Sequence, residues 1–421
     1  MKKLFPSVLL FLSALSLSAQ EPHLLPSLFP DSAKTKNTVL FTSDFIFASN
    51  AITNELVKEY FLNGFITDEM KDGVTKHLDS KNRFGGDFST ELYFRHKPDS
   101  MFCRRNWSWF IGLKNIDHIN STFPRDLFEV YFRGNKNYAG QTADFSGFNY
   151  LLLKYQQLQF GLSKSFKNHT ASYEAGAAVG LNVGQQLLRI QAPTATLYTE
   201  QIGEYLDLNS EIEIHTSDSL HKNFGSFNGF GLSTDLFFKT TVNKKHFFSA
   251  RISNLGFIRW NNRSAEVRSD TSFRFEGIEV TKLFDLFDTV RTSITSDSAI
   301  TQSFLTNRKY NSYTLLLPAK IEVHYQMITG VHSRVGIGAN HILHADYLPL
   351  GFLNFDYLWT TNLIGINISY GGYTTWGTGI YYRRHFKHGY ALSFGSNYIN
   401  SLFNLDKGTA ENIHLTLYRN F

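Results

Sequence analysis

The stretch LLLPAKIEVHYQM, from Leu315 to Met327, alternates apolar and polar side chains with a period of two. Its odd positions are apolar or aromatic, and the even positions that follow Pro318 are polar: Lys320, Glu322, His324 and Gln326. Neighbouring side chains of a strand point to opposite faces, whereas a helix would spread these polar residues around its circumference. The stretch therefore predicts a β-strand with one apolar and one polar face. Pro318 cannot donate a ladder hydrogen bond, so we expect it near a rim of the sheet.

The same alternation recurs along most of the chain. Many of the segments that carry it are roughly 9 to 11 residues long, the length that crosses a bilayer when a strand is tilted. The segments are 84–95, 106–117, 148–155, 158–166, 171–183, 228–240, 246–256, 315–327, 331–341, 350–358, 362–370, 376–386, 390–399 and 411–421. They predict an all-β fold, a transmembrane antiparallel β-barrel of about fourteen strands.

Composition and connections support a barrel over other β folds. Charged residues make up only 18% of the chain and aromatic residues 15%, as expected where every second side chain faces lipid. No apolar stretch of about eighteen residues occurs after the N-terminal region, which excludes membrane-spanning helices. A secreted β-sandwich would share this composition. Short gaps at 168–169, 243–245 and 387–389 alternate with long ones at 184–227 and 257–313, which favours a barrel with turns at one end and loops at the other.

Both ends of the chain carry export signals. Lys2 and Lys3 precede an apolar run to Leu17 and small residues up to Ala19, which predicts a cleaved signal peptide at residues 1–20. The last segment alternates to its end at Phe421 and resembles the sorting signal that the outer-membrane barrel-assembly machinery reads. We therefore predict the cell outer membrane as the location, with outer-membrane lipid and that machinery as partners.

The segment between the signal peptide and the barrel reads differently. Residues 51–65 place apolar side chains at helical spacing, and residues 67–78 are a second candidate helix with Asp68 and Glu69 in its first turn. We predict residues 21–80 to be an N-terminal segment with one or two amphipathic helices, and residues 81–421 to be the barrel. The helices form either a cap outside the barrel or a plug within it.

Candidate chemistry is sparse. Cys103 is the only cysteine, so no internal disulfide forms. The glycine-rich run 225–231 leads into a strand rather than a helix, and therefore lacks a phosphate cradle. One group of side chains is a candidate metal site: His341, His344 and Asp346. A second group is a candidate for phospholipase chemistry: His385, His388, Ser393 and Ser396. Neither has the spacing of a known site, so we expect no catalytic residue, metal or cofactor, and we name no ligand-binding residue.

Several short motifs carry a family resemblance. They are Phe123-Pro124-Arg125-Asp126-Leu127, Gly134-Asn135 to Gly140, Asp144 to Gly147, Asn228-Gly229-Phe230-Gly231 with Asp235, Asn254-Leu255-Gly256-Phe257-Ile258 with Trp260, and Phe275-Glu276-Gly277. With them the chain resembles a family of Bacteroidota outer-membrane barrels known only as a domain of unknown function. Ser27-Leu28-Phe29-Pro30 stands where that family usually has Asn-Pro-Ala. The family is similar at fold level to barrels of the fatty-acid-transporter type, which implies fourteen strands and a hydrophobic ligand.

Two functional hypotheses follow, and neither is an enzyme. The first is a barrel that binds or passes a small hydrophobic ligand, because the polar strand faces are rich in Gly, Ser and Asn and would leave space in the lumen. The second is a structural or secretion-associated barrel that docks partner proteins through its long loops. Nucleic acid is not an expected partner, because the basic clusters at 244–246 and 383–388 lack aromatic stacking platforms.

Overall fold

A closed barrel of fourteen antiparallel strands forms the body of the protein, as the alternation predicts. The structure is a computed structural model that describes residues 36–218, 225–276, 308–404 and 407–421. The predicted signal peptide lies outside the described residues. In order around the barrel, the strands are β1 (Asn37–Ser49), β2 (Lys81–His96), β3 (Trp107–Pro124), β5 (Phe148–Lys167), β6 (Ala171–Thr199), β8 (Gly229–Val242), β9 (His246–Trp260), β13 (Ala319–Ile328), β14 (Ser333–Leu343), β15 (Leu348–Trp359), β16 (Asn362–Gly372), β17 (Trp376–His385), β18 (Tyr390–Ser396) and β19 (Ala410–Asn420). Pairing of β1 with β19 closes the ring and leaves no barrel edge unpaired.

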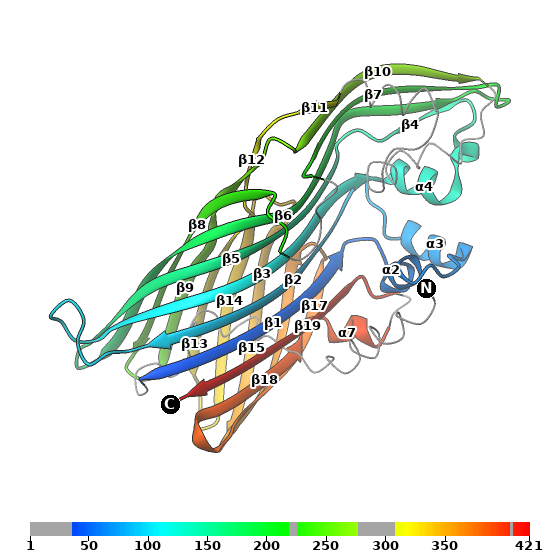
Figure 1. The fold of residues 1–421 in the computed structure, drawn as a ribbon. Helices are drawn as coiled ribbons and strands as arrows, with labels where there is room; N and C mark the ends of the chain where they lie inside the picture. The colour runs from blue at the N-terminus through cyan, green and yellow to red at the C-terminus, as the bar shows by residue number, and fades with distance from the viewer. Residues whose placement is uncertain (1–35, 219–224, 277–307, 405–406) are drawn as a thin grey trace, which may run out of the picture.

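The two ends of the barrel differ. At one end, which we call the turn end, short connections join β2–β3, β5–β6, β8–β9, β13–β14, β15–β16 and β17–β18. Strand β1 begins and strand β19 ends at the turn end, where Asn37 and Phe421 exchange backbone hydrogen bonds of 2.9 and 3.0 Å. At the opposite end, which we call the loop end, the helices and the longest strands project beyond the barrel (Figure 1).

Strands also extend from the loop end. Residues 187–199 of β6 continue past the barrel and pair with β7 (Tyr205–Thr216) and β4 (Gln141–Asp144), and β7 pairs with β10 (Ala265–Glu276). We call this extension, with β11 (Arg308–Tyr310), the wing (Figure 1). Helix α4 (Arg125–Arg133) packs against it through Val130, which joins a core with Leu197 and Ile214. Treating 184–227 and 257–313 as loops was therefore wrong, because much of both ranges is paired strand.

Two strand predictions were wrong, but together the two errors leave the predicted number of barrel strands unchanged. Strand β1 was missed, although it pairs over its length with β2 and β19. The segments 148–155 and 158–166 are one continuous strand, β5. The boundary placed at residue 81 was wrong for the same reason, because the barrel begins with β1 at Asn37. Pro318 lies between β12 (Tyr313–Leu316) and β13, outside both strands, where the pairing with β9 is interrupted.

The predicted helices are present and form a cap at the loop end. Helix α2 (Asn54–Phe61) is N-capped by Thr53, and α3 (Asp68–Thr75) by Thr67, whose hydroxyls accept from backbone N–H groups. Leu56 and Val74 pack with Phe123 of β3 and Phe128 of α4 in one apolar cluster. That packing places both helices at the rim rather than between the strands (Figure 1), so they form a cap and not a plug.

The remaining helices are short: η1 (Asn135–Tyr138), η3 (Lys387–Gly389) and α7 (Ile399–Leu402). Among the residues that the structure describes, no helix is long and apolar enough to cross a membrane.

The outward face of the barrel is apolar. Large exposed side chains recur on alternate positions of the strands, including Leu113, Phe160, Val179, Leu232, Phe257, Ile337, Leu353 and Ile366. Their inward neighbours are polar or small, which is the pattern of a barrel with lipid outside and a polar lumen. The alternation in the sequence therefore predicts which side chains face the lumen.

The lumen is packed near the turn end. Tyr93, Phe110 and Phe237 reach inward from β2, β3 and β8, with ring centroids 6.3 and 6.1 Å apart. They belong to a fully buried cluster that also contains Leu40, Ala178, Ala391 and Tyr418. We call this cluster the apolar floor. Side chains from seven strands meet in it, so it closes part of the lumen cross-section.

Candidate functional site

A cavity of about 140 Å³ lies in the lumen, on the loop side of the apolar floor. Its lining comes from strands that are far apart in sequence, with Asp44 on β1, Asp87 on β2, Lys114 on β3, Arg251 on β9 and Lys320 on β13. All are polar-face residues of alternating strands. The closed barrel therefore brings together charged groups that lie up to nearly 280 positions apart in the sequence.

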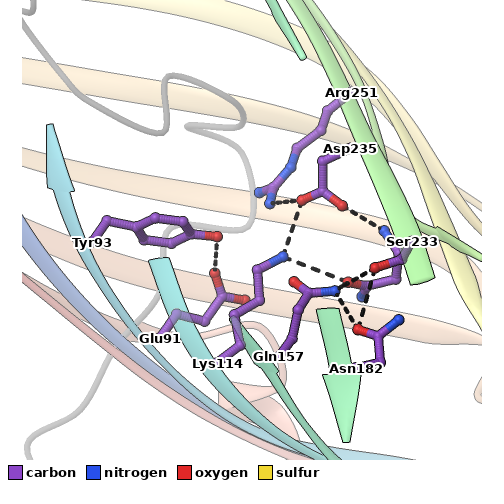
Figure 2. Close-up of polar contacts among 9 residues, drawn as sticks. Glu91, Tyr93, Lys114, Gln157, Asn182, Ser233, Asp235 and Arg251 are labelled. Atoms are coloured by element: carbon purple, nitrogen blue, oxygen red, sulfur yellow. Dashed lines mark hydrogen bonds and ion pairs between the residues drawn. The ribbon is translucent and has the colours of Figure 1, made fainter. Parts of the chain in front are cut away.

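The charged wall centres on Asp235, which lies on β8 beside the cavity. Its carboxylate is 3.0 Å from Lys114 Nζ and 3.5 Å from Arg251 Nη2 (Figure 2). The other carboxylate oxygen accepts the backbone N–H of Asn254 at 2.8 Å. Asn254 has a left-handed φ of 59°, at the register shift between β8 and β9. This bulge brings Asp235 and two cations together, a common use of bulges near functional sites.

A neutral amide cluster stands beside the charged wall. Gln157 donates to Asn182 at 3.0 Å and to Ser233 at 2.7 Å, and Ser233 donates to Asn182 (Figure 2). All three side chains are buried on β5, β6 and β8. These hydrogen bonds link β5, β6 and β8 behind Lys114, while Gln157 Oε1 and Asn182 Nδ2 have no partner among the described residues.

A second charged group lies on the neighbouring strands. His118 Nδ1 is 2.7 Å from one oxygen of Asp87, and Lys320 Nζ is 3.3 Å from the other. The Asp87 and His118 side chains are almost completely buried. Asp87 therefore orients both an imidazole and an ammonium at the cavity.

Three further carboxylates line the cavity without a cation within ion-pair distance in the part of the chain that the structure describes. Asp44 accepts a hydrogen bond from Asn412 at 3.0 Å, and Glu91 accepts one from Tyr93 at 3.0 Å. Glu322 lies opposite Arg251 in the β9–β13 register, but the guanidinium is directed to Asp235 (Figure 2). The cavity thus has more carboxylates than Lys and Arg side chains.

The remaining wall is apolar and aromatic. It consists of Ile46, Ile116, Tyr155, Ile342, Tyr347 and Tyr373. Tyr347 and Tyr373 pack edge to face, with ring centroids 5.0 Å apart. Both belong to an apolar cluster at the loop end, so the cavity lies between that cluster and the apolar floor.

Among the described residues, several buried polar atoms of lining side chains have no hydrogen-bond partner, including Arg251 Nε and His341 Nδ1. Two that can accept a hydrogen bond are His118 Nε2 and the hydroxyl of Tyr373, on side chains that are 2% and 1% exposed. Leaving such an atom unpaired costs about 1–3 kcal/mol. Both atoms are therefore available to a molecule in the cavity.

The structure does not gather the residues that were weighed for a metal. His341 lines the cavity, but Asp346 accepts from Asn149 at 2.8 Å, and His344 lies in the connection between β14 and β15. Within the described ranges, these three do not form a group of metal-ligating atoms.

The residues weighed for phospholipase chemistry are also separated. Ser393 lies opposite Arg383 and Ser396 opposite Ile380, whereas His385 lies opposite Ala391 and contacts Tyr418. His388 is in the β17–β18 turn. Cys103 is exposed in the β2–β3 turn.

One group of metal-ligating atoms does occur in the described residues, on the wing. Glu213, His215 and Glu266 place their ligand atoms within 4.8 Å of one another. Arg268 already pairs with both carboxylates, at 3.1 and 2.6 Å. Burial raises the pKa of Glu213, but the hydrogen bond and charge of His215, together with Arg268, hold that pKa below its usual value. The group is neutralised by the protein itself, and we assign it no metal.

The sequence analysis named no lumen residue as a ligand-binding site, although charged residues on the polar strand faces indicated one. Most charged side chains of the cavity occupy polar positions within the predicted alternating segments, as Lys320 and Glu322 do in the stretch LLLPAKIEVHYQM. Asp44 on β1 is the exception, because that strand was not predicted. Charge on the lumen face is a better indicator than histidine clusters in loops, because strand positions converge in a closed barrel and loop positions need not.

Fold and cavity define a class: a closed transmembrane β-barrel with an internal, charged cavity. Residues 24–415 match the family of unknown function DUF5723, and the chain belongs to that family. Asp235 and Asn254, quoted above for the resemblance, belong to the charged wall. No curated protein matches the chain.

Solved structures of other barrels are similar at low identity. The toluene transporter TodX of Pseudomonas putida is 7% identical, with 91% of this chain and 87% of that chain covered and a TM-score of 0.41. A FadL homologue of Pseudomonas aeruginosa is 9% identical, with 92% and 90% covered and a TM-score of 0.43. The translocator domain of the autotransporter NalP from Neisseria meningitidis is 7% identical, with 93% and 90% covered and a TM-score of 0.37.

Proposed function

We propose that this protein is an outer-membrane barrel that binds a small amphiphilic ligand in its lumen and passes it across the membrane. The observation that supports this most directly is the cavity between two apolar clusters, whose lining combines charged groups with Ile and Tyr side chains. Ligand pockets characteristically combine apolar walls with a few placed polar groups. A cavity of roughly 150 Å³ is large enough for a benzene-sized group.

Passage by this route differs from diffusion through an open pore. The apolar floor lies between the cavity and the turn end, and Arg95, Glu174 and Lys239 form buried ion pairs beyond it. Where the apolar floor closes the lumen cross-section, a solute that leaves the cavity toward the turn end must displace Tyr93, Phe110 or Phe237. We therefore expect a gated path rather than steady conductance.

We place the turn end in the periplasm and the wing outside the cell. Outer-membrane barrels have short turns on the periplasmic side and long connections on the outside, and the chain has both at opposite ends. The ligand would then enter from the loop end, beside the helical cap.

Conductance in planar bilayers tests the gate. The wild-type protein should show little steady current, and the double variant Tyr93→Ala/Phe237→Ala should show discrete open levels. Phe238→Ala is the matched control, because Phe238 is the next residue and points outward with 37% of its surface exposed. A wild-type channel that conducts as much as the double variant would contradict a closed floor.

Ligand binding is tested by the temperature at which the heat-modified gel band appears, measured with a panel of small amphiphiles. At least one member should raise it for the wild type. Ile116→Trp, which fills the cavity, should abolish that rise, whereas Ile111→Trp on the outward face should not. No rise with any member would count against the proposal.

A second candidate, docking of a partner protein, is favoured by the wing. Strands β7 and β10 are not needed for barrel closure, yet they pair over twelve residues. Trp260 and Tyr313 lie opposite each other, so residues 261–312 can be replaced by an Asn-Gly turn without shifting the barrel register. A stoichiometric partner that is lost in this variant, with ligand binding retained, would support docking.

A further inference from the structure

We propose that the lumen cavity selects ligands that carry a positively charged nitrogen on a small apolar body. This inference rests on the proposed ligand-binding function and names the chemical class of the ligand. It is carried by the charge balance of the cavity and by two buried atoms that face it without partners.

The charge balance comes first. Five carboxylates line the cavity or bond to its charged wall: Asp44, Asp87, Glu91, Asp235 and Glu322. Three cations accompany them: Lys114, Arg251 and Lys320. Lys114 and Arg251 share Asp235, and Lys320 pairs with Asp87. The three cations therefore form ion pairs with only two of the five carboxylates, Asp235 and Asp87.

The other three carboxylates, Asp44, Glu91 and Glu322, have no ion-pair partner among the described residues. Asn412 donates to Asp44 and the Tyr93 hydroxyl donates to Glu91 (Figure 2). In a lumen of low dielectric constant, a buried carboxyl group without an ion-pair partner either keeps a proton or binds a cation, so a cationic guest can replace the proton. The cavity therefore favours a positively charged guest over a neutral or negative one.

The two unpartnered atoms point to the same chemistry. Because Nδ1 of His118 bonds Asp87, the neutral ring keeps its proton on Nδ1 and presents a lone pair on Nε2. The Tyr373 hydroxyl accepts as well as donates. An ammonium group brings three donors, enough to satisfy one or both atoms and a carboxylate at once.

An organic ammonium fits this site better than a metal ion. In the part of the chain that is described, the cavity acids and His118 do not bring three ligand atoms within 4.8 Å of one another. A metal ion needs its ligands around one point, whereas an ammonium accepts separated acceptors. The tyrosine rings and the isoleucines of the lining suit an aromatic or aliphatic body, and tyrosine rings also attract cations.

Three probes of nearly equal shape test the inference: 2-phenylethylamine, 2-phenylethanol and 3-phenylpropionate. Binding is measured by isothermal titration to the full-length folded barrel in a neutral detergent at pH 7. We expect the amine to bind about tenfold or more tightly than the alcohol, and the acid to bind most weakly. Glu322→Gln should lower the affinity for the amine several-fold and leave the alcohol unchanged.

Controls keep the test decisive. Glu91→Gln is the second lumen variant, should Glu322→Gln fail to give a heat-modifiable band. Glu266→Gln on the wing removes the same charge far from the cavity and should change neither affinity. Equal binding of all three probes, or preference for the acid, would overturn the charge selection while leaving a ligand-binding lumen. Binding of none by the wild type would count against the proposed function itself.

Discussion

Gly365 on β16 lies directly opposite Tyr381 on β17, and the tyrosine ring occupies the space where a side chain at 365 would stand. A Cβ atom on Gly365 would be 2.0 Å from Cζ of that ring. The hydroxyl of Tyr381 donates to Asp356 on β15, which also accepts from Gln326 at 2.6 Å. A missing side chain on one strand thus lets an aromatic ring cross it and reach a buried carboxylate two strands away.

The first prediction follows from this pair. Gly365→Val should displace the Tyr381 ring and break its hydrogen bond to Asp356, at a cost of about 1–3 kcal/mol for overpacking and more for the lost bond. Gly351→Val is the matched control, because a Cβ at Gly351 meets nothing within 4 Å. The urea midpoint of unfolding, read from the heat-modified band, should fall only for Gly365→Val. An equal fall in both variants would show that valine itself disturbs the strands.

The second prediction concerns the buried charge at Asp235. Asp235→Asn keeps an oxygen for the backbone N–H of Asn254 but leaves Lys114 and Arg251 without their shared carboxylate. Breaking a buried ion pair on one side costs about 3–5 kcal/mol, so the unfolding midpoint should drop sharply. Asp207→Asn breaks an exposed pair with Arg274 on the wing and should change it little. Similar midpoints for both variants would mean that water already compensates the lumen charges.

Alternation predicted the strands where the two faces differ consistently, and it failed where they do not. In β1 the inward positions include Leu40 and the outward positions include Ser43, so no clean period appears. In β5 the inward positions change from apolar to polar after Tyr155, so one continuous strand was read as two segments. In β6 the extra residue Gln185 shifts the pairing with β5, and the inward positions change from even to odd residue numbers. A bulge changes which face a residue occupies without leaving a mark in composition.

The cavity was beyond reach of sequence reasoning for a different reason. Asp44 and Asn412 bond across the β1–β19 seam although 368 positions separate them. Which residues lie at one height of a barrel depends on strand tilt and stagger, and a shift of two residues on one strand would keep every alternation and replace the cavity lining. The sequence predicts which side chains face the lumen, and only the closed structure shows which of them meet.

The third prediction separates two roles of Phe421. Deleting it removes the two backbone hydrogen bonds with Asn37 as well as the ring, whereas Phe421→Ala removes the ring alone. If the assembly machinery reads the ring as a sorting signal, both variants should accumulate in the periplasm, measured as the loss of the heat-modifiable form from outer-membrane fractions. Normal assembly of Phe421→Ala with failure of the deletion would assign the role to barrel closure instead.

The last prediction fixes the orientation of the barrel with the chain's own cysteine. Cys103 is exposed in the β2–β3 turn at the turn end, so a membrane-impermeant maleimide should react with it only after the outer membrane is permeabilised. A Cys103→Ser/Ile202→Cys variant moves the thiol to the exposed β6–β7 turn of the wing, where 78% of the Ile202 surface is accessible. This variant should react on intact cells, because long connections of outer-membrane barrels face outward. The reverse labelling pattern would place the wing and the helical cap in the periplasm, and the ligand would then reach the cavity from inside the cell envelope.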